Sequence, residues 1–584
     1  MALSQSPQPY SSRAASSLRL GAATVLHHLK RHVGVGIICS VAYFDPGNWS
    51  VDLQAGSSFG YRPMLFVILM AGLGAQLVNH LLPDMQTLAY KLGCVTGLGK
   101  ILGYTLQTPA AQPPSSPSPG STTAELLGSA IGFCLLFPKL PLWAGVVLTA
   151  ADVLVFLAFG DPSRGQGRPV KLFEYTIIAL VFCVFGSFIA LLIKANPDWP
   201  QAFLGYLPDK GLFQSDPDAV YAAVGILGAT VMPHALFLGS SLATQDRISD
   251  ARREDEELPL PALSQQSITA RFRRFISSLF RIGRAERAAS TIDYRSRHGE
   301  RENRPLSFIK QHLNHGIVDV VTSLIALAVP INSAILILAA AVFFTGPGQN
   351  HNTPAGLFEA YDLIKSRIGD GSSLSDTPHR SPTLTIKLNP TAAALIFALA
   401  LICAGQTSSI TVTLAGQIVS EGFIEWKVSP FLRRIITRCI SLIPSMVVAI
   451  AVGRNGINTL LVASQVVLSV VLPFVAFPLI YLTSAEVVMR VRKPQEIVEV
   501  EVIPVPEESL VIDENQVDQD AVKVEVDHIE IVAVKALDKD QGDRTASGEY
   551  LDFSNGRIIA ALSYAIWGIV LVANAYAIVM LFVR

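Results

Sequence analysis

Long apolar runs recur along the whole chain, and most are close to the length of a membrane-spanning helix. They cover residues 34–57, 63–90, 141–160, 172–194, 219–243, 310–345, 391–422, 434–453, 457–484 and 557–583. About 20 apolar residues suffice for a helix to cross the hydrocarbon layer of a bilayer. A shorter run at 124–137 is brief for a crossing by itself. Counting it, the pattern predicts an all-α polytopic membrane protein with about eleven transmembrane helices.

Basic residues between the runs predict the orientation, because cytoplasmic loops carry an excess of Lys and Arg. If the N-terminus is cytoplasmic, most of the Lys and Arg residues fall in the inner loops. This distribution holds only if the run 124–137 also crosses the membrane. The basic groups on that side are Arg13, Arg19, Lys30 and Arg31; Arg164, Arg168 and Lys171; the Arg-rich segment 247–304; and Arg433, Arg434, Arg490, Arg492 and Lys493.

Polar segments divide the chain into regions. Residues 1–33 are rich in Ser and Arg, and are either a transit peptide or, the favoured interpretation, a cytoplasmic tail. Residues 105–122 are rich in Pro and Ser, which excludes a membrane helix there. The predicted regions are a tail (1–33), five spans (34–200), five more (215–484) with an Arg-rich cytoplasmic loop (244–306), an acidic cytoplasmic loop (485–555), and a last span (556–584). Val and Ile alternate with Glu and Asp within 494–548, which favours either short strands or a flexible acidic loop.

Composition narrows the function classes. Charged residues make up 16% of the chain, below the quarter or so of soluble domains, and the hydrophobic share is 50%. The six cysteines have no metal-ligand spacing, and a disulfide framework is not expected. No soluble catalytic constellation is present, so the protein is not expected to be an enzyme, and no permanent cofactor is expected.

Two of the apolar runs contain residues that interrupt a helix. The first run carries Asp45, Pro46, Gly47 and Asn48 near its middle, and the sixth carries Gly228 and Met232-Pro233-His234 at a comparable depth. Proline removes a helical hydrogen bond, and freed backbone at membrane depth must be buried in protein or line a wet cavity. Each interrupted run opens a group of five spans. This is the pattern of a transporter with two inverted repeats and a central site.

The side chains at these breaks favour a metal ion. Asp45 offers a carboxylate and Asn48 an amide oxygen, while an unwound sixth span frees a backbone carbonyl, taken as that of Ala229. Oxygen ligands alone suit Ca²⁺ or Mg²⁺, but the thioether of Met232 shifts the preference toward Mn²⁺, Fe²⁺ and Co²⁺. The alternative is that Met232 only fills space in the core.

At these residues the chain resembles the Nramp family of proton-coupled divalent-metal transporters, in its fungal form. The matching stretches are DPGNW at 45–49, GATVMPH at 228–234, GQTSSITVTLAGQIVSEGF at 405–423 and LVASQVVLSVVLPF at 461–474. They are spread over residues 34–484. The resemblance implies a LeuT-like core of two inverted five-helix repeats, with discontinuous helices 1 and 6, plus one additional helix.

The resemblance also implies roles for particular residues. It places metal ligation on Asp45, Asn48, the Ala229 carbonyl and Met232, adds Gln465 as a ligand, and makes Asn332 a supporting or gating group. It further implies a proton route that uses Asp45 together with His234, Glu125, Arg433 and Arg434.

Simpler roles remain open for these added residues. Asn332 and Gln465 can hydrogen-bond between helices, His234 can be a structural donor, and positive-inside anchoring explains Arg433 and Arg434 equally well.

The third span departs from the family pattern. Relatives have an aspartate in its first half, whereas this chain has the Pro/Ser stretch there and Thr122 at the expected position of the aspartate. Either the locus has diverged, or, as we favour, residues 96–123 come from a gene model that retained non-coding bases and lost an exon. A second departure is Ala235, where many relatives have Asn.

Three function classes follow from the sequence. The favoured one is a secondary transporter for Mn²⁺, Fe²⁺ and similar ions, coupled to protons and working by alternating access, in the plasma membrane or an endosomal or vacuolar membrane. A LeuT-like carrier of organic substrates is disfavoured by Met232. A non-transporting relative, like certain plant ethylene-signalling proteins, is favoured by the altered third span but disfavoured by Asp45, Asn48 and Met232. The expected partners are metal ions, protons and the lipid bilayer, and no nucleic acid.

Overall fold

The computed structural model describes the helical core of the chain and leaves several connecting segments outside its description. The described residues are 24–28, 30–74, 119–159, 170–214, 218–243, 245, 247–248, 306–344, 355–367, 390–424, 430–451, 453–493 and 550–583. Most of the tail 1–33, of the insert 105–122, of the loop 244–306 and of the acidic segment 485–555 therefore lies outside the described residues. The predictions made for those segments stay predictions.

The described elements are almost all helices. In chain order they are α2 (Val35–Val41), α3 (Pro46–Phe59), α6 (Pro119–Leu136), α7 (Leu142–Phe159), α8 (Lys171–Ala195), α9 (Trp199–Leu204), η2 (Lys210–Phe213), α10 (Ala219–Thr230), α11 (Pro233–Ala243), α15 (Leu306–Ser323), η5 (Leu324–Ala328), α16 (Val329–Ala339), η6 (Ala340–Phe344), α17 (Leu357–Arg367), α18 (Pro390–Ile424), α19 (Pro430–Ala451), α20 (Gly453–Thr483), α21 (Glu486–Met489), β1 (Arg490–Arg492), β2 (Tyr550–Asp552) and α22 (Arg557–Val583).

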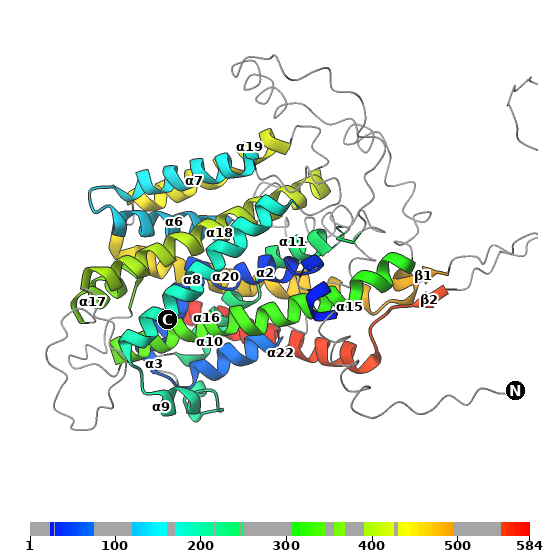
Figure 1. The fold of residues 1–584 in the computed structure, drawn as a ribbon. Coiled ribbons are helices and arrows are strands. Elements are labelled where there is room, and N and C mark those ends of the chain that lie inside the picture. Colours follow the sequence, from blue (N-terminus) through cyan, green and yellow to red (C-terminus); the bar gives the residue numbers. More distant parts are fainter. Residues whose placement is uncertain are drawn as a thin grey trace, which may run out of the picture.

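The long helices lie side by side in one bundle, as Figure 1 shows. Within the described residues, seven helices are long and apolar enough to cross a membrane, and three shorter apolar helices cover Met64–Gly74, Glu125–Leu136 and Leu142–Ala158. Together with the pair α2 and α3, they coincide with all eleven predicted segments, although the part of segment 63–90 beyond residue 74 is not described. The prediction of an all-α polytopic membrane protein is confirmed.

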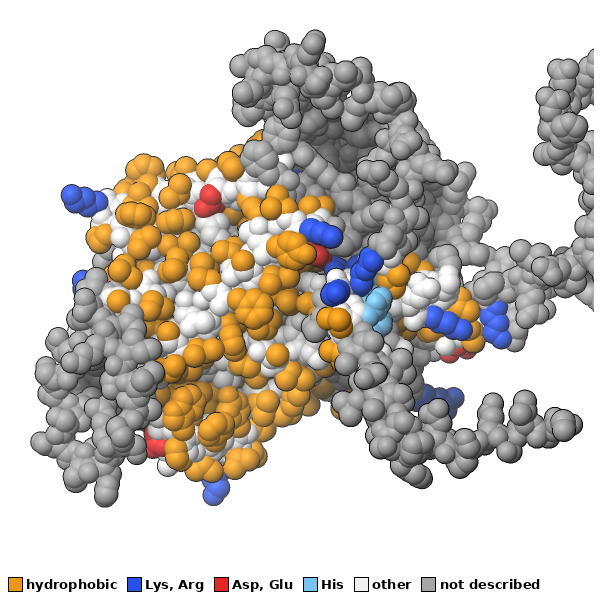
Figure 2. Space-filling view, in the orientation of Figure 1, with side chains coloured by type: hydrophobic (Ala, Val, Ile, Leu, Met, Phe, Trp, Pro, Cys, Tyr) orange, Lys and Arg blue, Asp and Glu red, His pale blue; other side chains and the backbone are white. Residues whose placement is uncertain are grey.

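The outer surface of the bundle is apolar, as expected for helices that face lipid. Hydrophobic side chains cover most of the face seen in Figure 2, and Lys and Arg lie mainly toward its margins. On α22 the side chains of Ile558, Ile569 and Val572 are 84%, 69% and 71% exposed. Such a continuous exposed apolar surface is unstable in water and stable against hydrocarbon.

Three features of the fold were not predicted. Helix α6 begins at Pro119, inside the segment 105–122 where we expected no membrane helix. Proline is well tolerated in the first turn of a helix, because its missing N–H would have no helical partner there. The amphipathic helix α17 lies between the predicted spans 310–345 and 391–422, where no element was predicted, and it packs against α18. The strands β1 and β2 pair antiparallel, with Val491 opposite Leu551, and hold together the two ends of the acidic segment.

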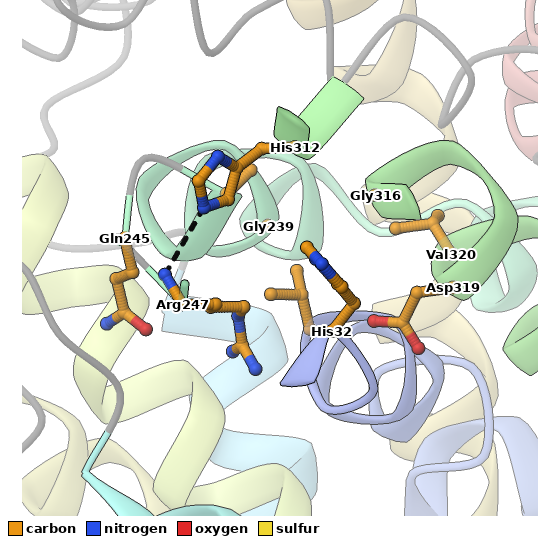
Figure 3. Close-up of a pocket in the computed structure, with 10 residues that line it drawn as sticks. His32, Gly239, Gln245, Arg247, His312, Gly316, Asp319 and Val320 are labelled. Atoms are coloured by element: carbon orange, nitrogen blue, oxygen red, sulfur yellow. Dashed lines mark hydrogen bonds between the residues drawn. The ribbon is translucent and has the colours of Figure 1, made fainter. Parts of the chain in front are cut away.

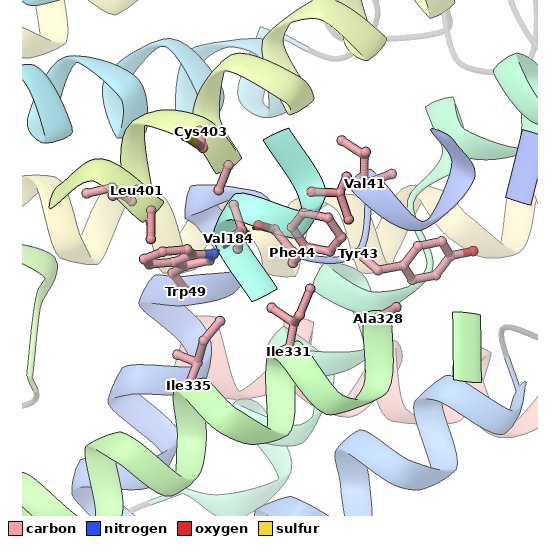
Figure 4. Close-up of a cluster of buried hydrophobic side chains, with 14 of the residues drawn as sticks. Val41, Tyr43, Phe44, Trp49, Val184, Ala328, Ile331, Ile335, Leu401 and Cys403 are labelled. Carbon is pink, nitrogen blue, oxygen red and sulfur yellow. Dashed lines mark hydrogen bonds between the residues drawn. The ribbon is translucent and has the colours of Figure 1, made fainter. Parts of the chain in front are cut away.

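The interior of the bundle surrounds the interrupted first span. Figure 4 shows Tyr43, Phe44 and Trp49 from this span among Val184 of α8, Ile331 of α16 and Leu401 of α18. The Trp49 ring makes an edge contact with Phe188, with centroids 4.7 Å apart. The break is therefore enclosed by protein, which is the condition for irregular backbone at membrane depth.

Candidate metal site

The first interrupted span consists of α2 and α3, separated by residues 42–45. Pro46 is the first residue of α3, where its lack of an N–H does no harm. Asp45 is the N-cap, and its Oδ1 accepts a hydrogen bond of 2.8 Å from the backbone N–H of Asn48. The Trp49 ring N–H donates to the Phe44 carbonyl over 2.9 Å and ties the connecting loop to α3. Asp45 is thus fixed at the break, and its second oxygen has no hydrogen-bond partner among the described residues.

The second interrupted span consists of α10 and α11, separated by Val231 and Met232. The carbonyl of Ala229 would ordinarily accept from the residue four positions later, but that residue is Pro233, which has no N–H. The carbonyl end of α10 also carries the negative pole of the helix dipole, which attracts a cation. Both effects favour a cation beside the Ala229 carbonyl, and Met232, three residues later at the break, is fully buried.

Glycines bring helix α20 against both breaks. A Cβ atom on Gly47 would overlap with Nε2 of Gln465, and the same point lies 3.2 Å from Oδ2 of Asp45. A Cβ atom on Gly228 of α10 would overlap with the backbone carbonyl of Gln465. Only glycine allows these close approaches. Gln465 therefore lies beside Asp45 on one side and beside the end of α10 on the other.

Several polar atoms at this point have no hydrogen-bond partner among the described residues. They are Oδ2 of Asp45, both amide atoms of Asn48 and both amide atoms of Gln465. All three side chains are fully buried, at 0% exposure. Buried polar groups in native proteins are almost always satisfied, and each exception calls for an explanation. For the oxygen atoms of Asp45, Asn48 and Gln465, a bound cation is such an explanation.

Asn332 lies next to the first break, on α16. Its Nδ2 donates a hydrogen bond of 2.6 Å to the carbonyl of Tyr43, in the loop that joins α2 to α3. The amide oxygen of Asn332 has no partner among the described residues. Asn332 thus holds unwound backbone beside Asp45, which fits both the simple interhelical role and the supporting role that the resemblance implied.

Glu125 and His234 are two further buried titratable residues close to the helix breaks. Glu125 of α6 is fully buried and lies within electrostatic range of Asp45, because Gly128, one turn later, packs directly on Pro46. His234 is the second residue of α11 and is 6% exposed. Neither Glu125 carboxylate oxygen, nor Nε2 of His234, has a partner within the described part of the chain.

The arginine of helix α19 that lies near Glu125 is Arg438. The sequence analysis had instead proposed Arg433 and Arg434. Arg434 is buried, but its Nε donates to Gln417 over 2.6 Å and its Nη1 donates to the Leu157 carbonyl over 3.1 Å, which is a structural arrangement. The side chain of Arg433 lies outside the description. Arg438, one turn later, is 2% exposed and lies within electrostatic range of Glu125 and Asp152.

The sequence analysis missed Arg438. The signal was a positive residue deep inside an apolar segment, rather than at the end where anchoring explains it. Its Nη2 donates to both the carbonyl and the hydroxyl of Ser409, at 2.8 Å and 2.7 Å.

The donor set differs from common protein metal sites. No group of three or more His, Cys, Asp or Glu side chains able to hold a metal ion occurs among the residues that the structure describes. The central site instead combines one carboxylate, two amide groups, a backbone carbonyl and a thioether. One negative charge leaves a bound divalent ion with net positive charge, which favours release over permanent retention.

Comparison with known proteins identifies the family. Residues 36–505 match the family described as Nramp, natural resistance-associated macrophage protein-like. The iron transporter SMF3 of Saccharomyces cerevisiae is 32% identical over 567 residues, which cover 95% of this chain and 97% of that protein. The manganese transporter pdt1 of Schizosaccharomyces pombe is 35% identical over 476 residues, covering 79% and 76%. The divalent metal cation transporter MntH of Nostoc is 34% identical over 467 residues, covering 78% and 83%.

Solved structures agree on the fold. The manganese transporter of Eremococcus coleocola, solved with an aromatic bis-isothiourea compound, aligns with a TM-score of 0.59 at 23% identity, covering 98% of this chain and 88% of that one. This likeness confirms the predicted LeuT-like fold with discontinuous first and sixth spans. The relatives are named as transporters, in agreement with the expectation that the chain is not an enzyme. The chain belongs to the Nramp family of transporters.

Proposed function

We propose that this protein moves divalent transition-metal ions such as Mn²⁺ and Fe²⁺ across a membrane, together with protons, by alternating access. The observation that carries the proposal is a group of buried side-chain oxygen atoms at the two helix breaks. These oxygens, from Asp45, Asn48 and Gln465, have no hydrogen-bond partner among the described residues and could bind a metal ion. Relatives named as iron and manganese transporters support the choice of ions. The direct test is uptake of Mn²⁺ by a cell that lacks its own metal transporters and expresses this chain.

The proposed ligands are Asp45, Asn48, the Ala229 carbonyl, Met232 and Gln465. The carboxylate supplies the charge, the amide and carbonyl oxygens complete a hard shell, and the sulfur distinguishes transition metals from Ca²⁺ and Mg²⁺. Because the two breaks belong to different helices, rocking of one repeat against the other would open the site to one side at a time.

Protons would pass along groups that lie around the site. We propose Asp45, Glu125 and His234 as proton-accepting groups, with Asn332 as a supporting or gating residue. Of the arginines, Arg438 is a better partner for Glu125 than Arg433 or Arg434, because the guanidinium of Arg434 is already held by Gln417 and Leu157.

The remaining topology is part of the same proposal. The N-terminus would lie in the cytoplasm, as the Lys and Arg residues of the short loops favour. A plasma-membrane, endosomal or vacuolar location suits a metal importer. The two inverted repeats would comprise residues 34–200 and 215–484.

Replacement of Met232 by alanine is expected to weaken the discrimination between Mn²⁺ and Ca²⁺. The change removes the soft ligand but leaves the oxygen ligands in place, so Mn²⁺ affinity should fall roughly tenfold, or about 1.4 kcal/mol, while Ca²⁺ becomes a better competitor. The measurement is Mn²⁺ uptake against increasing Ca²⁺ in wild type and variant.

A matched control is Met232→Leu, which keeps volume and apolar character but has no sulfur. If Met232 only fills space, Met232→Leu will keep the Mn²⁺ preference, and the ligand role will be disproved. If it is a ligand, both variants will lose that preference to a similar extent.

A further inference from the structure

Five histidines gather at one end of the bundle, away from the central site. His27, His28 and His32 come from the helical segment before α2, and His312 and His315 come from α15. The rings of His32 and His315 are stacked with centroids 4.2 Å apart, and those of His28 and His315 are 5.2 Å apart. Nearly 290 residues of sequence separate the two groups, so the tertiary fold creates this cluster.

Two of these rings point nitrogen atoms at each other. Nδ1 of His28 lies 3.1 Å from Nδ1 of His315. Two nitrogens bound to one ion at about 2.1 Å, and about 90° apart, are separated by about 3 Å. The pair therefore has the spacing of two neighbouring ligands of one transition-metal ion.

The surroundings keep these rings neutral and available. Burial, together with the neighbouring His315 and His27, lowers the pKa of His28. The same causes, burial first, lower the pKa of His32 to about 3. A lowered pKa means that the neutral form, which has a free lone pair on one nitrogen, predominates at pH 7. His32 is 3% exposed, and its Nε2 has no hydrogen-bond partner in the described part of the chain.

Arg247, Asp319 and His312, which line the pocket beside the cluster, already have hydrogen-bond or ion-pair partners. Arg247 forms an ion pair with Glu174, and its Nη1 donates to the Val33 carbonyl over 3.4 Å. Asp319 accepts a hydrogen bond of 2.7 Å from the Gly36 N–H. His312 is engaged as well, because its Nε2 accepts from the Arg247 backbone N–H. His28 and His315 hydrogen-bond to each other through their Nδ1 atoms, and no other side-chain hydrogen bond of either ring is seen among the described residues.

The cluster borders a pocket that reaches the helix of the central site. Figure 3 shows His32, His312, Arg247 and Asp319 around this pocket, with Gly239 of α11 in its wall. Helix α11 begins directly after Met232. The pocket therefore lies along the same helix and is lined by residues of α2, α11 and α15.

We propose that His28 and His315 form a second binding site for divalent transition-metal ions, at the mouth of the route from the central site. No three ligating side chains surround one point within the described ranges, so water would complete the coordination, and binding would be weak enough for exchange. Imidazole nitrogen suits Fe²⁺, Ni²⁺, Cu²⁺ and Zn²⁺ better than Ca²⁺ and Mg²⁺. The position on a release route rests on the proposed function, whereas the binding itself does not.

The test is a titration of the purified full-length protein with Co²⁺, followed by its visible absorption and by calorimetry. Wild type should bind two ions. Asp45→Ala should keep one ion, bound through nitrogen, and the double variant His28→Ala/His315→Ala should keep one ion at the central site.

His312→Ala is the matched control, because it removes a histidine of the cluster that is already hydrogen-bonded. It should bind two ions like wild type. The proposal is overturned if Asp45→Ala binds no Co²⁺, or if His28→Ala/His315→Ala still binds two ions. If Asp45→Ala binds two ions, the central site is wrong and the histidine site can stand, so the two failures are distinguishable.

Discussion

Substitution of Asp45 by alanine is expected to abolish Mn²⁺ uptake. Asp45 supplies the only formal negative charge among the proposed ligands, and without it the amide, carbonyl and thioether groups must hold a divalent ion alone. Loss of a group that merely supports a ligand already costs about 10–100-fold in metal affinity, so loss of the charged ligand itself should exceed about 100-fold. Uptake of radioactive Mn²⁺ into cells lacking their own transporters measures this directly.

Asp45→Asn separates binding from folding. Asp45 also caps α3 through Oδ1, and alanine would remove that cap at a cost of about 1 kcal/mol. Asparagine keeps an oxygen that can accept from the Asn48 N–H but has no charge. We expect Asp45→Asn to have the thermal stability of wild type and the transport defect of Asp45→Ala. Transport by Asp45→Asn at the wild-type rate would exclude Asp45 as the essential ligand.

Substitution of Glu125 by glutamine is expected to uncouple protons from the metal. Glu125 is buried between Asp45 and Arg438, with no partner for its oxygens among the described residues, and glutamine keeps its shape but cannot carry a proton. In liposomes with the purified protein, an inward Mn²⁺ gradient should acidify the interior for wild type and not for Glu125→Gln. Uptake by wild type should rise as the external pH falls, whereas uptake by Glu125→Gln should be nearly independent of pH.

A pair of arginine variants shows which residue serves the proton route. Arg438→Lys should disturb the coupling, because Arg438 faces Glu125, and Arg434→Lys should mainly lower thermal stability, because Arg434 binds Gln417 and the Leu157 carbonyl. Coupling that is lost in Arg434→Lys and intact in Arg438→Lys would reverse this assignment. Coupling that persists in Glu125→Gln would remove Glu125 from the route.

The helix breaks were predictable because their causes are local. Pro46 and Pro233 remove hydrogen bonds within their own helices, and the polar residues beside them lie inside otherwise apolar runs. The structure places the breaks where expected, with α3 starting at Pro46 and α11 at Pro233. The loss of the helical hydrogen-bond donor to the Ala229 carbonyl also follows from the sequence, since the residue four positions later is Pro233.

The features that were missed depend on tertiary packing. Arg438 and Arg434 both lie on α19, and only the packing of α19 against α6 and α7 decides which one faces Glu125. The amphipathic helix α17 is stable because it rests on α18, which its own sequence does not reveal. The pairing of His28 with His315 joins segments that are distant in sequence, and no local pattern indicates it.

The most direct test of the central claim is X-ray absorption at the Mn K-edge of purified protein loaded with one equivalent of Mn²⁺. The His28→Ala/His315→Ala background avoids a contribution from the histidine cluster. A first shell of oxygen atoms with one sulfur, and loss of the sulfur signal in Met232→Ala, is the predicted result. A shell of oxygen and nitrogen alone, unchanged in Met232→Ala, would contradict a transition-metal site built between the two broken helices.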